Sequence, residues 1–537
     1  MFHRKWQVGE QVPLGYNRMV KNLRLWIIPT LIILFYLFSH LYRLTLLPVF
    51  ADEAIYIRWT QLIIDDWRQY LFFPLNDGKT PLLMWLMMPF QFLFKDQLFA
   101  GRFVAVLIGL GQILSLGYLV KLLDGKTKTA RLAMILGSVL PFWFFHHRMA
   151  LTDALLCLGI TWTIIGVIQI VRNKQKFLWI SLTGLFLGLA LWAKLPAILI
   201  IPSLFLYPWL KRAKLNSKTK HITHISLAIL GGLTLFFSLR LHPVFSQLFS
   251  RGGDFLYPWK EVIFQSKWRE TVINVPNYIN YFGAYLTWPI LLLNLLGQLL
   301  PDTKKRRIQH ILVGSALLFA GPIALLGKVV YPRYFLPVSI FLTVSAVLVV
   351  QELVLMALKQ KTYWKRVFLG ITLGVMLINT VIISSKFIYF SLTNPSKTPF
   401  VSADQEQYLY RWSSGHGIKE SVNFIKDLAR DQTIAVATEG SFGTLPDGIL
   451  LYFHRQNVDN IYIEGIGFPV REISEKFMNR AINFDQILLI VNSHRLEIDL
   501  PQGNLLREYC RPDNSPCLQI WDITQLLKEG KLPLKKS

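Results

Sequence analysis

Long runs of apolar residues dominate the first 390 positions of this 537-residue chain. Several runs reach about 18 residues with almost no charge, the length that an α-helix needs to cross a bilayer core. A shorter apolar run, 81–94, is expected to be an outward-facing interfacial or re-entrant segment. We therefore predict an α-helical polytopic membrane protein with about eleven spans, at 25–42, 99–121, 130–146, 151–171, 177–193, 195–210, 223–240, 278–299, 309–328, 334–358 and 367–390.

The pattern changes after Asn394-Pro395, where short alternating segments replace the long apolar runs. This predicts a C-terminal α/β domain over 391–537, long enough to have its own core. The segments that define it are helical patterns at 417–430 and 445–453 and strand-like runs at 433–437, 461–466, 486–491 and 517–523.

Two polar stretches interrupt the predicted transmembrane domain, 25–390, and are expected to form outer loops at 43–98 and 241–277. Within the first loop, residues 53–69 have the spacing of an amphipathic helix. Its apolar side would carry Ile55, Trp59 and Trp67, so we expect it to lie on the membrane surface.

The distribution of charge sets the expected orientation. The formal net charge is +25, but residues 391–537 hold 16 Lys and Arg against 18 Asp and Glu. The positive excess therefore belongs to the membrane part, where basic clusters fall in short loops, and it indicates cytoplasmic loops rather than a nucleic-acid partner. We expect a multi-pass protein of the cell (plasma) membrane, with residues 1–24 cytoplasmic and the C-terminal domain extracytoplasmic.

The chain has three cysteines. Cys157 falls inside a predicted span, where a cysteine packs as a small apolar residue. Cys510 and Cys517 flank a short loop, and an extracytoplasmic location would permit a disulfide between them. The sequence leaves that pairing open.

Acidic and basic residues gather on the predicted outward face. Asp52 and Glu53 follow the first span, and Asp153 begins a later one. Carboxylates can remove a proton from a hydroxyl group. The basic residues suit a phosphate group at the membrane surface. They are Lys79, Arg148, Lys194 and Arg333.

Each of these residues also has a simpler explanation. Asp52, Glu53 and Asp153 could serve as helix caps or partners of a helix dipole. The lysines and Arg333 could anchor helices at the lipid headgroups. His146-His147 suggests a metal site with Asp153, but adjacent histidines on a helix point in different directions. We therefore expect no obligatory metal, although a divalent ion stays an alternative.

Five short motifs occur in order on this face, and together they resemble the GT-C membrane glycosyltransferases. The most similar families are the dolichyl-phosphate-mannose protein mannosyltransferases and the lipid A aminoarabinose transferases. The resemblance covers about residues 25–390. The motifs are Asp52-Glu53-Ala54-x-Tyr56, Gly78-Lys79-x-Pro81-Leu82, Arg148-Met149-Ala150-x-Thr152-Asp153-Ala154, Gly188-Leu189-Ala190-x-x-x-Lys194 and Arg333-Tyr334-x-x-Pro337.

The resemblance implies an enzyme that moves a sugar from a polyprenyl-phosphate donor to an acceptor hydroxyl, with inversion of the anomeric centre. It implies that Asp52, with Glu53 beside it and Asp153 as the second acid, deprotonates the acceptor. Lys79 and Arg333 would hold the lipid phosphate. Further candidates for binding the phosphate or sugar are Tyr56, Arg148, Lys194 and Tyr334. The acceptor would be a lipid, a glycan or a protein.

Two other functions stay open at this point. A transporter or lipid-carrier flippase would need charges near the bilayer midplane, whereas the centres of these spans are nearly uncharged. The chain could also be an inactive receptor or scaffold whose outer domain carries the function. The sequence indicates neither the sugar nor the acceptor.

Overall fold

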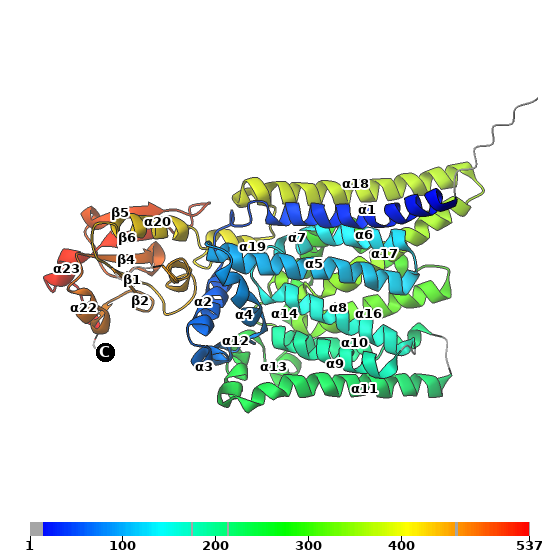
Figure 1. Cartoon of the computed structure of the whole chain (residues 1–537), viewed down its shortest axis with the longest axis horizontal. Coiled ribbons are helices and arrows are strands. Elements are labelled where there is room, and N and C mark those ends of the chain that lie inside the picture. Colours follow the sequence, from blue (N-terminus) through cyan, green and yellow to red (C-terminus); the bar gives the residue numbers. More distant parts are fainter. Residues whose placement is uncertain (1–13, 173–174, 212–213, 457–459, 536–537) are drawn as a thin grey trace, which may run out of the picture.

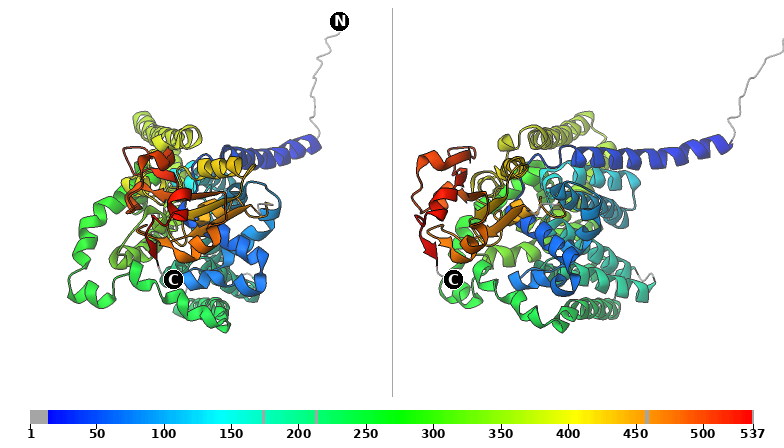
Figure 2. Two further views of the ribbon diagram at one scale, coloured as in Figure 1. Left: turned by 90° about the vertical axis from the view of Figure 1, so that its left-hand side faces the viewer. Right: turned by 60° about the vertical axis from the view of Figure 1, so that its left-hand side comes forward.

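The computed structural model describes residues 14–172, 175–211, 214–456 and 460–535. Residues 1–13 of the predicted cytoplasmic segment lie outside the described residues. Long helices run side by side through most of the molecule, and a small α/β domain is attached at one end of the bundle (Figure 1). Short helices form a layer between the two (Figures 1 and 2).

Eight helices in the described residues are long and apolar enough to cross a membrane. The α-helices of this bundle are α1 (Leu14–Leu41), α5 (Gln97–Asp124), α6 (Thr127–Val139), α7 (Pro141–His146), α8 (Thr152–Val171), α9 (Lys176–Ala193), α10 (Ile201–Leu204), α11 (Leu215–Phe237), α14 (Trp268–Phe282), α15 (Trp288–Gly297), α16 (Thr303–Leu326), α17 (Val338–Lys359) and α18 (Tyr363–Thr393).

Proline interrupts two of the predicted spans. The span predicted at 130–146 is divided into α6 and α7 at Pro141, which begins α7. The span predicted at 195–210 is not one α-helix but a series of short 3₁₀ and α turns, each with a proline near its start. A proline lacks the amide hydrogen that continues a helix and clashes with the preceding turn.

One further predicted span differs in detail, and the short run 81–94 is, as expected, not one long helix. The predicted 278–299 span contains a π-helical turn, Gly283–Thr287, between α14 and α15. The run 81–94 forms α4 (Leu82–Met87) and a 3₁₀ turn, Met88–Phe92, and is too short for a regular span.

Helix α2 (Ala51–Asp65) lies in the layer between the bundle and the C-terminal domain. It ends because Asp66 caps the next helix, α3 (Trp67–Tyr70), by accepting hydrogen bonds from Arg68 and Gln69. The expected surface helix over 53–69 is therefore wrong in two respects. The helix is divided in two, and α2 is buried on several sides, whereas Trp67 is 59% exposed.

The same layer contains α12 (Gly252–Phe255) and α13 (Trp259–Phe264) from the second outer loop. A linker follows α18 and includes α19 (Ser402–Gln405) and a π-helical turn, Glu406–Tyr410. The linker passes close to the start of α2, where Ala51 donates its amide hydrogen to the Ser413 carbonyl oxygen at 2.9 Å. A Cβ on Gly415 would lie 2.1 Å from the Val49 carbonyl oxygen, so the close approach requires glycine.

The C-terminal domain is built on a mixed five-stranded sheet of order β2-β1-β4-β6-β5. Strands β1, β2 and β4 are parallel, and β6 and β5 are antiparallel to their neighbours. The elements are α20 (Ile418–Leu428), β1 (Ile434–Thr438), α21 (Asp447–Leu450), β2 (Ile461–Gly465), β3 (Ile473–Ser474), α22 (Glu475–Ala481), β4 (Gln486–Asn492), β5 (Leu505–Tyr509), β6 (Leu518–Asp522), α23 (Thr524–Lys528) and β7 (Leu534–Lys535).

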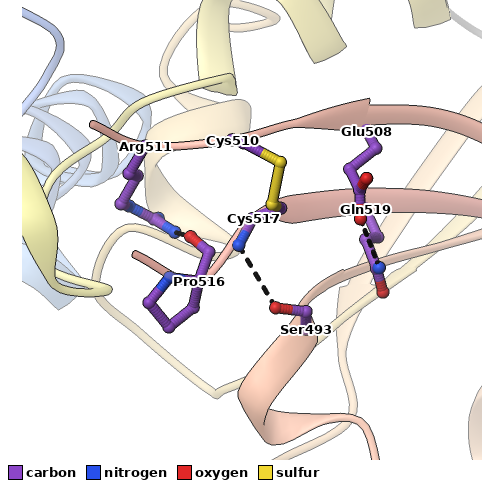
Figure 3. Close-up of a disulfide and its surroundings, with 7 residues drawn as sticks. All are labelled: Ser493, Glu508, Cys510, Arg511, Pro516, Cys517 and Gln519. Atoms are coloured by element: carbon purple, nitrogen blue, oxygen red, sulfur yellow. Dashed lines mark hydrogen bonds between the residues drawn. A yellow bond between two sulfur atoms is a disulfide. The ribbon is translucent and has the colours of Figure 1, made fainter. Parts of the chain in front are cut away.

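The predicted elements of this domain recur within a few residues, but the structure also contains elements that were not predicted, among them helices α22 and α23. The helix expected over 445–453 is only the single turn α21, and strand β5 and the short pair β3–β7 were not predicted. Cys510 and Cys517, whose pairing the sequence left open, form a disulfide between the ends of β5 and β6 (Figure 3).

Candidate functional site

Asp52 and Glu53, adjacent in the first turn of α2, have different surroundings. Glu53 is fully buried, and its carboxylate accepts hydrogen bonds from the Phe50 and Ala150 amides at 3.1 and 2.7 Å. It also pairs with Arg102 on α5 at 2.7 Å. These contacts join α2 to α5 and to the segment before α8. Glu53 therefore fills the cap position that the sequence left open as an alternative.

Asp52 points to a different group of side chains. Its carboxylate pairs with Arg333 at 2.8 Å, and 23% of the Asp52 side chain is exposed. Burial alone would raise the pKa of Asp52, but the charges of Arg333, Lys79 and Lys194 hold it below its usual value. Three of the predicted cations therefore surround one predicted acid.

Lys79 reaches this group from the loop 43–98, which the sequence predicts to be an outer loop. Gly78 ends a 3₁₀ turn in the left-handed conformation, with φ at +69°, and so directs the chain toward Lys79. An ion pair between Asp77 and Arg251 at 2.6 Å fixes the turn against the second outer loop. The Lys79 ammonium lies 5.8 Å from the centre of the Phe255 ring.

Asp153 forms the second acid–base pair of the site. It lies in the first turn of α8 and bonds Lys194 at 2.7 Å, at the junction after α9. Only 3% of the Asp153 side chain is exposed. The Lys194 ammonium also lies 5.1 Å from the centre of the Tyr334 ring. The two ion pairs therefore adjoin each other through Lys194 and the Arg333-Tyr334 turn.

Arg333 links the predicted residues. Burial alone would lower its pKa, but Asp52, followed by Tyr334, Tyr408 and Asp153, raises that pKa well above the usual value. Its guanidinium lies 5.2 Å from the Phe50 ring centre and 5.6 Å from that of Tyr334.

Tyr56 lies one helical turn after Asp52 and is buried. Burial raises the pKa of its hydroxyl well above the usual value. The charges of Asp52 and Asp153 raise this pKa further, whereas that of Arg333 lowers it. The structure therefore brings together Asp52, Tyr56, Lys79, Asp153, Lys194, Arg333 and Tyr334.

Arg148, another predicted phosphate ligand, is engaged elsewhere. Its guanidinium donates hydrogen bonds to the backbone carbonyls of four residues at the end of α1 and just beyond it: Ser39, His40, Tyr42 and Arg43. It therefore caps α1 by neutralising its terminal carbonyl groups. In this arrangement Arg148 acts on the position of α1 and does not join the cations around Asp52.

Within the described residues, the side chains of His146, His147 and Asp153 do not bring three ligand atoms close to one another. The ring of His147 lies with those of Tyr36 and His40, at 5.9 and 6.0 Å between centroids. Among the described residues, the one group with enough ligand atoms close together is Glu508 with Cys510 and Cys517. Those cysteines are joined in the disulfide, so they have no thiolates to offer.

Sequence reasoning missed three buried residues near the site. Arg102 is an ionisable residue inside a predicted span, and its rarity there could have identified it. Asp404 and Tyr408 lie in the linker to the C-terminal domain, where no motif marks them. Asp404 is fully buried, and Tyr408 is 2% exposed.

The charges suit a phosphate ester. Around the acids Asp52 and Asp153 stand three cations, Arg333, Lys79 and Lys194, so these five side chains together carry one excess positive charge. A phosphodiester carries one negative charge. A cluster of charges of this kind favours such an ester and stabilises the further charge that develops when its ester bond breaks.

Comparisons of the sequence and of the structure with known proteins both point to membrane glycosyltransferases. Residues 78–238 match the sequence profile of the dolichyl-phosphate-mannose-protein mannosyltransferase family. No protein of curated function matches the chain in sequence. The solved structure of ArnT from Cupriavidus metallidurans in the apo state is similar, with a TM-score of 0.56 at 13% identity, over 94% of this chain and 99% of that one.

Two more structures are similar and contain lipid phosphates. ArnT from Cupriavidus metallidurans bound to undecaprenyl phosphate gives a TM-score of 0.55 at 13% identity, over 92% of this chain and 97% of that one. The archaeal oligosaccharyltransferase AglB from Archaeoglobus fulgidus, with an inhibitory peptide and a dolichol-phosphate, gives 0.52 at 11%, over 88% and 70%. This multi-pass membrane protein therefore shares the fold of these glycosyltransferase structures and, over residues 78–238, the sequence profile of the mannosyltransferase family, in line with the resemblance of its motifs.

Proposed function

We propose that this protein transfers a sugar from a polyprenyl-phosphate donor to an acceptor hydroxyl at the extracytoplasmic face of the membrane. The observation that carries the proposal is the ion pair between Asp52 and Arg333, with Lys79 and Lys194 close by. The lipid phosphates in the similar ArnT and AglB structures support the class of donor. The disulfide in the C-terminal domain supports its extracytoplasmic location, because disulfides persist in oxidising compartments.

In the proposed reaction, the acceptor oxygen attacks the anomeric carbon as the bond from that carbon to the phosphate oxygen breaks. The acceptor proton passes to Asp52, and the phosphate leaves with its charge held by Arg333 and Lys79. A single displacement of this kind inverts the anomeric centre. The reaction needs no oxidant or reductant.

Asp52 is the better candidate for the base because it is the more accessible acid. Its side chain is 23% exposed, whereas that of Asp153 is 3% exposed. Asp153 instead positions Lys194, which it contacts at 2.7 Å. We assign Glu53 a structural role, since four hydrogen bonds already occupy its carboxylate.

The pairing with Arg333 makes Asp52 a weak base in the ligand-free protein, because it lowers the pKa of the carboxyl group. Arginine binds a phosphate through two parallel hydrogen bonds. A donor phosphate that takes over Arg333 would therefore release Asp52 and raise its pKa. Under this proposal, donor binding prepares the base for the acceptor.

The proposal is tested with the full-length protein in lipid nanodiscs and a panel of undecaprenyl-phosphate-linked sugars. We expect wild type to release undecaprenyl phosphate from at least one of them when membrane lipid or glycan acceptors are added. Asp52→Asn should lower that rate about 10²–10⁴-fold, as loss of a general base does. The control is Asp431→Asn, an exposed acid of the C-terminal domain. Normal turnover by Asp52→Asn would reject Asp52 as the base.

A further inference from the structure

The linker between α18 and the C-terminal domain contributes two buried polar side chains near Arg333. Asp404 lies in α19, and Tyr408 lies one turn later in the π-helical segment. The Tyr408 ring centre lies 4.8 Å from that of Phe50, and the Arg333 guanidinium lies 5.2 Å from the same ring. The linker therefore forms one wall of the site.

Charges of the site act on the Tyr408 hydroxyl. Burial raises its pKa most, Arg333 lowers it, and Asp404, Asp153 and Asp52 raise it further. Both proposed acids and the central cation thus lie within electrostatic range of this one hydroxyl group. Tyr408 faces the same charged cluster as the residues predicted from sequence.

Three buried polar atoms here have unfilled hydrogen-bonding capacity. Asp404 accepts a hydrogen bond from the Tyr285 hydroxyl through Oδ2, at 2.5 Å. Within the described parts of the chain, Asp404 Oδ1, the Tyr408 hydroxyl and Arg333 Nε have no hydrogen-bond partner. Buried polar atoms are usually paired, and leaving one unpaired costs about 1–3 kcal/mol.

The unpaired atoms define the chemistry of a complementary group. Arg333 Nε can only donate, an ionised Asp404 can only accept, and the Tyr408 hydroxyl can do both. A phosphate oxygen only accepts, and above the pKa of about 7 that burial gives Asp404, its carboxylate would also repel a phosphate. A hydroxyl group both donates and accepts, so it complements all three atoms.

We propose that Asp404 and Tyr408, beside Arg333, form a recognition subsite for a substrate hydroxyl group. The hydroxyl belongs to the sugar of the donor or to the acceptor. This inference rests on the proposed glycosyltransferase activity and deepens it. It also gives the C-terminal region a role in catalysis, because the segment that joins it to the bundle supplies both side chains.

The test compares Tyr408→Phe with wild type, using full-length protein in nanodiscs. The probes are undecaprenyl phosphate and the undecaprenyl-phosphate-linked sugar that wild type turns over. Tyr410→Phe is the matched control, since Tyr410 lies in the same π-helical turn and is half-buried. Asp404→Asn is a second variant, and thermal unfolding confirms that each protein is folded.

We expect Tyr408→Phe to bind undecaprenyl phosphate as wild type does, because the proposed phosphate ligands, Arg333 and Lys79, are unchanged. If the hydroxyl belongs to the donor sugar, binding of the sugar-linked lipid falls about tenfold, the effect of one hydrogen bond. If it belongs to the acceptor, donor binding is unchanged and transfer falls by a similar factor. Asp404→Asn should show the same pattern.

Monodeoxy sugars sharpen the test. A site built to bind a hydroxyl group rejects an analogue that lacks it. Wild type should therefore discriminate against one monodeoxy donor or acceptor, and Tyr408→Phe should discriminate about tenfold less. If Tyr408→Phe discriminates against the monodeoxy compound as strongly as wild type does, the inference is contradicted. The three unpaired atoms would then bind only a structural water.

Other results also overturn it. These are an equal loss of affinity for undecaprenyl phosphate and its sugar conjugate, no loss in any assay, or the same loss in Tyr410→Phe. Failure of the proposed function looks different: wild type itself would then transfer no sugar from any polyprenyl phosphate. If wild type is active and Tyr408→Phe and Asp404→Asn match it, the inference alone fails.

Discussion

The two sides of the first turn of α2 carry the same chemical group in opposite environments. On one side, Glu53 is fully buried and bonded to Arg102 and two backbone amides. On the other side, Asp52 is 23% exposed, and it pairs with Arg333 near Lys79 and Lys194. A ligand that enters from the exposed side could contact the same cations. A carboxylate whose bonds are all filled holds the fold, whereas one whose partners can be exchanged is free to react.

The largest expected effect concerns the Glu53 side and is on stability. Glu53→Gln removes the charge that balances buried Arg102, and breaking a buried pair in this way costs about 3–5 kcal/mol. We expect a much lower unfolding temperature in detergent, with the remaining folded protein still able to bind undecaprenyl phosphate. Asp52→Asn is the matched variant and should unfold close to wild type. Equal unfolding temperatures for both variants would remove the contrast between the two acids.

A substitution of Lys79 tests whether the cations near Asp52 bind the lipid phosphate. Lys79→Ala removes one cation near the phosphate, and a hydrogen bond to a charged group contributes about 1.5–3 kcal/mol. We expect at least a tenfold loss in affinity for undecaprenyl phosphate and a smaller effect on the KM for acceptor. Lys95→Ala, an exposed lysine of the same outer loop, is the control. A loss confined to the acceptor KM would place Lys79 away from the phosphate.

A smaller effect is expected from Asp404, through pH. Burial raises the pKa of its carboxyl group from 3.8 to about 7 in the folded protein, with Tyr285 and Arg333 opposing that rise. The unfolded chain therefore ionises first, and this group makes the folded state less stable as pH rises from about 4 to about 7. Thermal unfolding should show a decline between about pH 4 and pH 7 that is reduced in Asp404→Asn. An identical pH dependence in the two proteins would count against the buried position of Asp404.

The comparison also shows what the sequence could reveal. Apolar length predicted the bundle, and the motifs predicted the fold that the solved structures share, because both signals can be read directly from the chain. Seven of the predicted site residues meet at one place because their motifs lie near helix ends or in the turns between helices at the same end of the bundle. The local sequence pattern could not show that Asp52 and Glu53 have different roles. The structural role of Glu53 depends on its contact with Arg102, which lies 49 positions away in the sequence.

Two other features depend on distant contacts. Arg148 belongs to the same sequence motif as Asp153, but its guanidinium donates its hydrogen bonds to backbone carbonyls at the end of α1. Asp404 and Tyr408 reach the site only because the linker packs against the start of α2, a contact between segments more than 350 residues apart. Span boundaries failed where prolines divide an apolar run, since hydropathy does not register a missing amide hydrogen.

The most direct test measures the affinity of Asp52→Asn for undecaprenyl phosphate, together with its transfer rate. If the lipid phosphate competes with Asp52 for Arg333, removal of the carboxylate charge should tighten phosphate binding while transfer is lost. Arg333→Ala should weaken binding in the same assay. Weaker binding by Asp52→Asn, or tight binding with normal transfer, would contradict the account.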